Sequence, residues 1–261
     1  MPELPEVEIY RRYFARHALD QAIGRVRVLD ERVLGNVRKA RLTRALEGRS
    51  FTAVTRHGKH LFADAGATWL HLHFGMTGDL AYYRDPKPPP RFARVVFDFT
   101  SGAHLAFEDM RLFGVVDLTP SPETFIAEHH LGPDPLDPSF RLPLFRRLIS
   151  GRRGAVKSLL MSQDIIAGIG NLWADETLFH SAIHPRRPVD RLTDTEVRTI
   201  HASMRRILRE VVARRERGAD LPRRYLIHRR EEGERCPLCA GSIQRSVVFG
   251  RTTYFCGTHQ S

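Results

Sequence analysis

The C-terminal part of the sequence holds two pairs of residues with the spacing of metal ligands. Two residues separate Cys236 from Cys239, and Cys256 and His259 repeat that spacing further along the chain. Tetrahedral Zn²⁺ takes four nitrogen or sulfur donors, and two tight turns that each present two ligands supply them. Because protein fills all four positions, we expect one structural rather than catalytic zinc ion.

The segment around these ligands predicts a small unit of its own. Residues 231–261 are too few for a separate hydrophobic core, so a bound metal would hold them folded, and unbound buried thiols are the weaker interpretation. Between the ligand pairs, SVVFGRTTYF predicts two strands joined at Phe249–Gly250–Arg251. Arg251 then lies near the tip of a hairpin, where it can reach a phosphate or a groove.

A second chemical possibility lies at the start of the chain, which reads MPELPEVE. Removal of Met1 leaves Pro2 with a free secondary amine. An α-amino group titrates at about pH 8 and lysine at about 10.4, so roughly 10% of this amine is a neutral nucleophile at pH 7. Glu3 places a carboxylate beside it that can transfer protons. The motif alone is also compatible with a simple helix start at Pro2.

The chain of 261 residues carries 41 Lys and Arg against 30 Asp and Glu, a net charge of +11, which favours a polyanionic partner such as nucleic acid. A hydrophobic content of 42% excludes general disorder. The apolar runs fall short of the roughly 18 residues of a membrane span, and the N-terminus lacks the basic and apolar regions of a signal peptide. We therefore expect a cytoplasmic protein, nucleoid-associated in a bacterial cell, with no membrane partner.

The first half of the chain predicts one helix followed by strands. Residues 3–16 favour an amphipathic helix, because apolar residues recur there at helical spacing. From about residue 23 to 118, short β-like runs such as TWLHLHF and FARVVFDF alternate with turns rich in proline and glycine. No helical crossover separates the later strands, so we expect antiparallel strands packed as a sandwich.

The second half is predicted to be mainly helical. The most distinct helix is expected over about 194–215, where Thr193 and Glu196 form a capping-box pattern. Its buried stripe is expected to comprise Val197, Ile200, Met204, Ile207, Leu208 and Val211. Shorter helices are expected over residues 142–150, 155–162 and 172–181.

Proline-rich stretches mark the expected domain boundary. TPSPETF and GPDPLDPSF favour a linker between the strand-rich and helical parts. The predicted division is an N-terminal catalytic β-sandwich domain over 1–119, a linker over 120–138, a helical domain over 139–230 and a zinc finger over 231–261. Nothing in the pattern indicates oligomerisation, so we expect a monomer.

Several motifs together resemble the Fpg/Nei family of DNA glycosylases, named for formamidopyrimidine-DNA glycosylase and endonuclease VIII. The matching segments, in family order, are PELPEVE at 2–8, Lys59, HLHFGMTG at 71–78, EDMRLFG at 108–114, QDIIAGIGNLWADETLFHSAIHP at 163–185 and FGRTTYFC at 249–256. The resemblance covers nearly the whole chain. It implies an α+β fold with an N-terminal antiparallel β-sandwich and helix, a C-terminal helix–two-turn–helix domain and a zinc-binding β-hairpin.

The resemblance implies a bifunctional DNA glycosylase and AP lyase of base excision repair. Pro2 would attack the sugar C1′ and form an iminium ion (a Schiff base), which acidifies the neighbouring C–H and permits β,δ-elimination. Glu3 would be the general acid and base, and Glu6 a second carboxylate near the lesion pocket. Lys59 would contact the phosphate next to the damaged nucleotide.

The implied partner is double-stranded DNA that contains a damaged base or an abasic site. The residues expected to contact it are His73, Met76, Arg111, Phe113, Asn171 and Arg251. Lys59, Asn171 and Arg251 would hold the phosphates around an extruded base, which positions the strand without reading its sequence. The methionine, arginine and phenylalanine side chains would fill the gap that the base leaves.

The chain departs from the family pattern at three places. His259 stands where a fourth cysteine is common, and imidazole also binds zinc. EDMRLFG replaces a common DPRRFG, so Met110 and Leu112 alter the region that faces the opposite base. Residues 217–235 lack the longer glycine-rich segment that caps a flipped 8-oxoguanine in specialised members. We therefore expect formamidopyrimidines or oxidised pyrimidines as substrates more than 8-oxoguanine.

Two other functions stay open at this point. The chain could be an abasic-site lyase only, with a degenerate base pocket, and assays of damaged-base and abasic duplexes side by side would separate this from a glycosylase. It could also be a non-catalytic zinc-finger DNA-binding protein with a relic active site. The presence of Pro2, Glu3 and Lys59 together argues against the relic.

Overall fold

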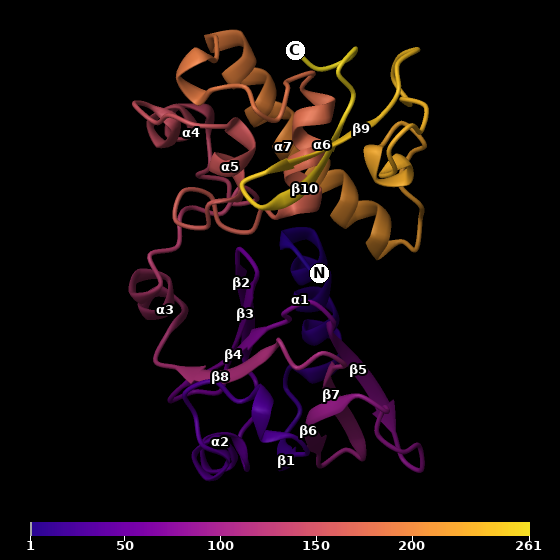
Figure 1. The fold of residues 1–261 in the computed structure, drawn as a ribbon. Helices are drawn as coiled ribbons and strands as arrows, with labels where there is room; N and C mark the ends of the chain where they lie inside the picture. Colours follow the sequence, from indigo (N-terminus) through magenta and orange to yellow (C-terminus); the bar gives the residue numbers. More distant parts are fainter. Residues whose placement is uncertain (1) are drawn as a thin grey trace. The chain divides into compact units, whose positions relative to one another are not determined.

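The computed structural model describes residues 2–261, which form two compact units (Figure 1). Unit 1 contains Pro2 and Glu6–His130, and unit 2 contains Glu3–Pro5 and Leu131–Ser261. Helix α1 (Leu4–Ala18) therefore contributes its first two residues to unit 2 and the rest to unit 1. The finer boundaries expected from the sequence stay predictions.

Unit 1 is built around two four-stranded sheets in which all paired strands are antiparallel. The sheet with strand order β1-β6-β7-β5 comprises β1 (Ile23–Val28), β5 (Gly78–Arg84), β6 (Ala93–Phe99) and β7 (Ala103–Asp109). The sheet with strand order β2-β3-β4-β8 comprises β2 (Ala53–His57), β3 (His60–Asp64), β4 (Trp69–His73) and β8 (Val115–Thr119). The predicted antiparallel sandwich is confirmed.

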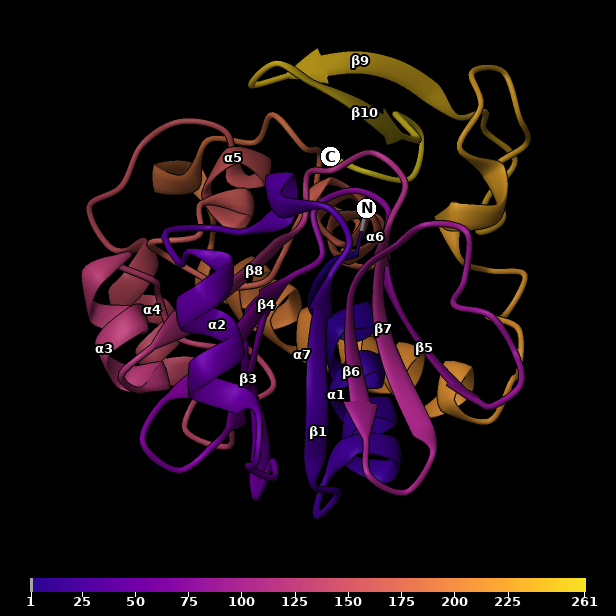
Figure 2. The ribbon, with the colours of Figure 1, turned by 90° about the horizontal axis from the view of Figure 1, so that it is seen from below.

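Apolar side chains from both sheets form the core of unit 1. In β4, Leu70 and Leu72 are fully buried, as the alternating pattern predicts. Figure 2 shows helix α1 and the β1-β6-β7-β5 sheet from below, and the hydroxyl of Tyr13 in α1 accepts the N–H of Tyr82 in β5 at 2.9 Å. The N-terminal helix thus belongs to the structure that carries the strands.

Two helices of unit 1 were not predicted, namely α2 (Lys39–Leu46) and α3 (Pro122–Glu128). Helix α3 lies in the segment predicted as a linker, and the hydroxyl of its N-cap residue Ser121 accepts the N–H of Thr124. Its Phe125 packs on His71, with ring centroids 4.2 Å apart. His71, on the face of β4 that alternates with the leucines, is consequently only 4% exposed.

Unit 2 is mainly helical, and its helices are α4 (Leu142–Ile149), α5 (Val156–Met161), α6 (Asn171–His180) and α7 (Asp194–Glu216). Short 3-10 helices span Glu31–Val33 in unit 1 and Val189–Arg191 and Leu226–Arg229 in unit 2. The capping box of α7 is confirmed, since Thr193 N–H donates to Glu196 at 2.6 Å and Glu196 N–H donates to the Thr193 hydroxyl at 3.2 Å. Every position of the predicted α7 stripe is buried.

The C-terminal part of unit 2 forms the predicted hairpin. Strands β9 (Gln244–Val248) and β10 (Arg251–Phe255) pair antiparallel and are joined at Phe249–Gly250 (Figure 1). Within residues 2–261, a helix with the length and apolar character to span a bilayer is not found.

Candidate active site

Glu3 is buried against the N-terminus of α6, with only 2% of the residue exposed. Its carboxylate accepts three backbone N–H groups, from Gly170 at 2.8 Å, Leu172 at 2.9 Å and Trp173 at 3.2 Å. The first turn of a helix has unpaired N–H groups and a positive partial charge, both of which favour a carboxylate. The main chain of unit 2 therefore holds this side chain in one position.

Helix α6 has no residue of its own that caps its N-terminus, so Glu3 takes that role. The N-cap residue Gly170 makes no side-chain cap, and the first turn of the helix has no acidic residue. A Cβ on Gly170 would lie 2.3 Å from Cδ of Glu3, so the approach requires glycine. Two residues earlier, Gly168 adopts φ 97° and its carbonyl accepts the N–H of Leu4 at 3.0 Å. The GIGN segment at 168–171 thus holds both the backbone at Leu4 and the side chain of Glu3, the residue that follows Pro2.

Pro2 and the two glutamates of α1, Glu6 and Glu8, differ in their surroundings. Pro2 and Glu6 are half-buried. Glu8 forms ion pairs with Arg11 at 2.8 Å and Arg56 at 3.3 Å. Burial opposes the ionisation of Glu8, but hydrogen bonds and charges from the neighbouring arginines outweigh it and lower its pKa to about 2. Glu8 therefore keeps its charge at neutral pH and is a structural anion rather than a proton donor.

Lys59 lies in the tight turn between β2 and β3, where it is half-buried. The turn is made possible by Gly58, which has φ 55°. His73 ends β4 at the same end of this sheet, because the strand register pairs it with His60. Burial and the charge of Lys59 lower the pKa of His73, so this imidazole is neutral at pH 7. Its Nδ1 accepts the N–H of Gly75 at 3.2 Å.

Met76, Arg111 and Phe113 lie on two loops that touch each other. Met76 is 40% exposed and Phe113 is 55% exposed. The guanidinium of Arg111 lies over the ring of Phe113, 5.1 Å from its centroid. A Cβ on Gly75 would lie 2.4 Å from the carbonyl carbon of Phe113, so the two backbones are in contact. The structure thus brings these three predicted residues into one exposed group.

Asn171 and the hairpin residues are close to each other within unit 2. Nδ2 of Asn171 donates to the carbonyl of Thr252 at 2.9 Å, while its Oδ1 is buried without a hydrogen-bond partner among residues 2–261. Arg251 is exposed and follows a turn in which Phe249 and Gly250 have φ of 50° and 69°. The asparagine therefore ties α6 to the strand that carries the arginine.

Three cysteines gather beside the hairpin. The sulfur atoms of Cys236, Cys239 and Cys256 all lie within 4.8 Å of one another, which could hold a metal ion. Burial raises the pKa of Cys236 to about 11. His259 is not in this group, and its Nε2 forms a hydrogen bond with the carbonyl of Phe179 at 2.9 Å. A bond to a carbonyl leaves Nδ1 as the nitrogen that could bind a metal, so the role of His259 as fourth ligand stays a prediction.

Comparison with protein families gives two matches that together span most of the chain. Residues 1–116 match the formamidopyrimidine-DNA glycosylase N-terminal domain, and residues 131–222 match the formamidopyrimidine-DNA glycosylase H2TH domain. The chain belongs to the formamidopyrimidine-DNA glycosylase family.

Individual relatives agree with this assignment. A formamidopyrimidine-DNA glycosylase of Symbiobacterium thermophilum is 35% identical over 98% of this chain and 88% of its own, and one of Brevibacillus brevis is 34% identical over 98% of each. The complex of the Lactococcus lactis Fpg with DNA that contains an abasic site is similar at a TM-score of 0.89, with 26% identity over 99% of both chains. MutM in complex with DNA that contains carbocyclic 8-oxo-G is also similar, at a TM-score of 0.89 and 26% identity over 100% of both chains.

Within this member of the family, Asp109 is a residue that sequence reasoning missed. It is fully buried and accepts the Thr77 hydroxyl at 2.5 Å, the N–H of Arg111 at 3.1 Å and the N–H of Gly114 at 2.6 Å. It therefore fixes both loops that carry the exposed group. A carboxylate at the end of a β-strand pattern has no signal in the sequence that separates it from a solvent-exposed residue.

A buried ion pair that attaches the hairpin to the helices was also missed. Nζ of Lys157 lies 2.7 Å from Oδ1 of Asp175 and donates to the Thr253 hydroxyl at 2.6 Å. Asp175 Oδ2 accepts the N–H of Tyr254 at 3.2 Å and pairs with Arg230 at 2.9 Å. Burial raises the pKa of Asp175 and lowers that of Lys157, and each partner's charge opposes the shift of the other. In the glycosylase this network fixes β10, the strand that begins at Arg251.

Proposed function

We propose that this member of the formamidopyrimidine-DNA glycosylase family removes oxidised bases from double-stranded DNA and then cleaves the strand at the abasic site. The observation that carries the proposal is the position of Glu3, a buried carboxylate held by three main-chain N–H groups directly beside Pro2 in the chain. Such a residue transfers protons efficiently only when it is held within reach of the reacting group.

The nucleophile in this proposal is the amine of Pro2, freed by removal of Met1. The amine attacks C1′ of the damaged nucleotide while the bond from C1′ to the base breaks, and the base takes up the proton that the amine releases. Glu3 in its protonated form then gives its proton to the ring oxygen as the C1′–O bond breaks and the sugar opens, and an iminium ion forms between Pro2 and C1′. The iminium acidifies the C2′–H bond, so that β-elimination expels the 3′ phosphate and δ-elimination the 5′ phosphate. Water then releases the amine from the sugar fragment.

Lys59, Asn171 and Arg251 are proposed to hold the phosphates that flank the extruded nucleotide. Positive side chains and polar groups at element termini suit that task. The exposed group formed by Met76, Arg111 and Phe113 supports a role in filling the space left by the base, because apolar side chains inserted between base pairs replace lost stacking. His73 and Glu6 are proposed to act beside these residues, in DNA contact and in the lesion pocket respectively.

The three cysteines and His259 are proposed to bind one structural zinc ion. The donor set fits, because Zn²⁺ takes thiolate and imidazole ligands in tetrahedral sites. When bound, the ion cross-links the segments on either side of the hairpin. The role of the residues is to hold Arg251 on a rigid strand rather than to take part in bond breaking.

We further propose that formamidopyrimidines and oxidised pyrimidines are better substrates than 8-oxoguanine. The segment 217–235 is short, and its glycines are Gly218 and Gly233, so it offers no extended flexible cover for a flipped purine. Met110, which is 53% exposed, alters the loop expected to face the opposite base.

Borohydride trapping tests the proposal. Incubation with an abasic duplex and borohydride should give a covalent protein–DNA adduct, which Pro2→Gly should weaken and a substitution that blocks Met1 removal should abolish. Absence of any adduct would leave only a DNA-binding protein. A panel of duplexes with dihydrouracil, formamidopyrimidine, 8-oxoguanine or an abasic site then separates a glycosylase from a lyase only. Excision of 8-oxoguanine opposite cytosine as fast as dihydrouracil would refute the substrate preference.

A further inference from the structure

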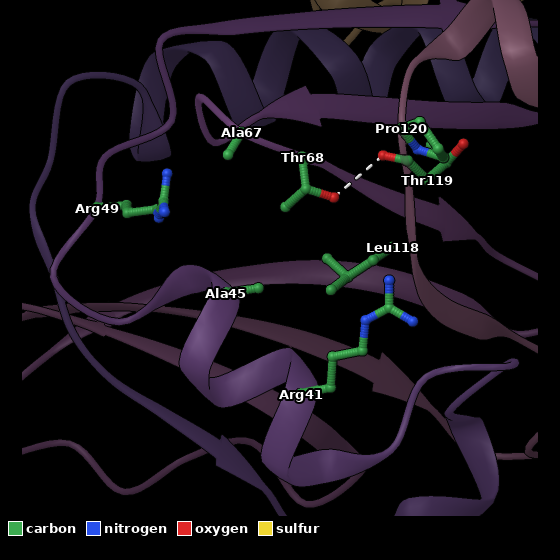
Figure 3. A pocket seen from close by; sticks show the side chains of 8 residues that line it. All are labelled: Arg41, Ala45, Arg49, Ala67, Thr68, Leu118, Thr119 and Pro120. Atoms are coloured by element: carbon green, nitrogen blue, oxygen red, sulfur yellow. Dashed lines mark hydrogen bonds between the residues drawn. The ribbon is translucent and has the colours of Figure 1, made fainter.

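Unit 1 contains a cavity of about 290 Å³ that the proposed reaction does not use. It is lined by Arg41, Ala45, Arg49, Ala67, Thr68, Leu118, Thr119 and Pro120 (Figure 3). These residues come from α2 and the turn after it, from the turn between β3 and β4, and from the end of β8 and the residue that follows it. Three segments far apart in the sequence thus form one concave site.

The rim of the cavity is positively charged. Figure 3 shows the guanidinium groups of Arg41 and Arg49 on either side of the cavity, with Ala45 and Leu118 between them. Arg49 donates to the carbonyl of Ala65 at 3.2 Å. Within the part of the chain that the structure describes, neither arginine forms an ion pair with a carboxylate, and the lining has no acidic residue. Both charges are therefore available to an anionic partner.

The wall of the cavity is apolar. Ala45 and Leu118 are half-buried and pack against the core of unit 1, and Pro120 extends the same surface. A hydrogen bond joins two of the lining residues, in which the hydroxyl of Thr68 donates to the carbonyl of Thr119 at 3.1 Å (Figure 3). A volume near the lower limit of small-molecule sites has room for one large apolar side chain, which is how anchor residues of peptides bind.

The position of the cavity separates it from the residues proposed to contact DNA in the same unit. Lys59 lies at the start of β3, and Ala67 and Thr68 lie beyond its other end. Five residues of strand span about 17 Å. Met76 follows β4 and Phe113 precedes β8 at the end of the sheet where Lys59 lies. A duplex held at that end leaves the cavity free.

We propose that this cavity binds an acidic peptide segment of a partner protein. An apolar side chain of the peptide enters the cavity between Ala45 and Leu118, and carboxylates on either side of it pair with Arg41 and Arg49. Arginine binds carboxylates in bidentate fashion, and such pairs give specificity when they surround a buried anchor. A DNA backbone would satisfy the two arginines but has no apolar group for the wall, so a peptide fits both features.

Fluorescence anisotropy with the full-length protein tests the proposal. The probe is a fluorescein-labelled peptide with one leucine between two pairs of aspartates, and the control peptide has serine in place of leucine. We expect Arg41→Ala to weaken binding about tenfold, because it removes a charge-assisted contact. Arg44→Ala, a change at an exposed arginine of the same helix that does not line the cavity, should alter affinity less than about twofold.

A second variant tests the site by a change that is expected to leave the fold intact. Ala67 is exposed in a turn, so Ala67→Glu should leave the fold intact and repel the peptide carboxylates. The serine peptide should bind at least about fivefold more weakly, and a saturating undamaged duplex should not displace the leucine peptide. The proposal is overturned if Arg44→Ala weakens binding as much as Arg41→Ala, if both peptides bind equally, if the duplex displaces the peptide, or if the wild-type protein does not bind it.

Discussion

Replacement of Gly170 by alanine tests the link between the GIGN segment and the acid–base residue. The backbone of Gly170 has φ −121° and ψ −161°, an extended conformation that alanine adopts without strain. The added Cβ would lie 2.3 Å from Cδ and 2.4 Å from Oε1 of Glu3. These distances are far inside van der Waals contact, so the carboxylate must move while the local backbone is otherwise compatible with the substitution.

The cost in stability follows from the hydrogen bonds that the carboxylate makes. Its displacement leaves the N–H groups of Gly170, Leu172 and Trp173 without their acceptor, and an unpaired buried N–H costs about 1–3 kcal/mol. Partial relaxation will restore some of these bonds, so we expect a loss of about 2–4 kcal/mol. For a unit of this size the midpoint of thermal unfolding should fall by roughly 7–14 °C.

The effect on activity should be larger than the effect on binding. Single-turnover cleavage of a dihydrouracil duplex should slow by roughly 10²–10⁴, the usual contribution of a positioned acid or base. Affinity for an uncleavable abasic analogue should change by less than about threefold, because the side chains proposed to contact phosphate are unchanged. Gly24→Ala is the matched control, since its Cβ would make only an ordinary contact with Thr100 at 3.4 Å.

Two results would refute this reasoning. A Gly170→Ala protein that cleaves the duplex within about threefold of wild type would show that the position of Glu3 is not critical for proton transfer. A variant that loses activity only in proportion to lost DNA affinity would place the defect in binding instead. Glu3→Gln provides the comparison, because it keeps the side-chain shape and removes the carboxylate.

Three further predictions concern the metal site, pH and the nucleophile. Cys256→Ser should reduce bound zinc below one equivalent and increase hydrogen exchange across β9 and β10, and unchanged metal content would contradict the predicted ligand set. Burial lowers the pKa of His71 from 6.5 to about 3, so its neutral form stabilises the fold above pH 6.5 and this contribution is lost as pH falls toward 3. Between pH 7 and 5 the free energy of unfolding, measured with urea, should therefore fall by about 2 kcal/mol. His71→Gln should make this free energy depend less on pH. An unchanged pH dependence in the variant would show that His71 is not the cause. Mass spectrometry of active protein should show Pro2 as the first residue, and retention of Met1 would rule out the amine as nucleophile.

The elements with strong local patterns were predictable from the sequence. Helix α7 has a capping box at Thr193 and an apolar stripe, and both determine where it begins and which face it buries. The alternation in β4 predicts that Leu70 and Leu72 face the core. The spacing of Cys236 and Cys239 from Cys256 predicts thiols that converge, and they do. In each case the residues that decide the outcome lie within a few positions of one another or follow a short repeat.

Other features depend on packing between distant segments and had no local signal. Helix α3 buries His71 because Phe125 lies over it, although the alternating pattern of β4 places that histidine opposite the core. Asp109 connects two loops only because β5, which follows one loop, pairs with β7, which precedes the other. Lys157 and Asp175 form a buried pair because α5 and α6 pack together with β10 above them.

A carboxylate next to Pro2 and a glycine-rich turn before α6 can both be read directly from the amino-acid sequence. Their meeting is visible only in the folded chain, where Glu3 accepts the N–H of a residue 167 positions away. A helix N-terminus needs acceptors for its free N–H groups, but its own residues do not specify which part of the chain supplies them. Here Gly170 leaves room for one particular carboxylate, and no local pattern records that fit.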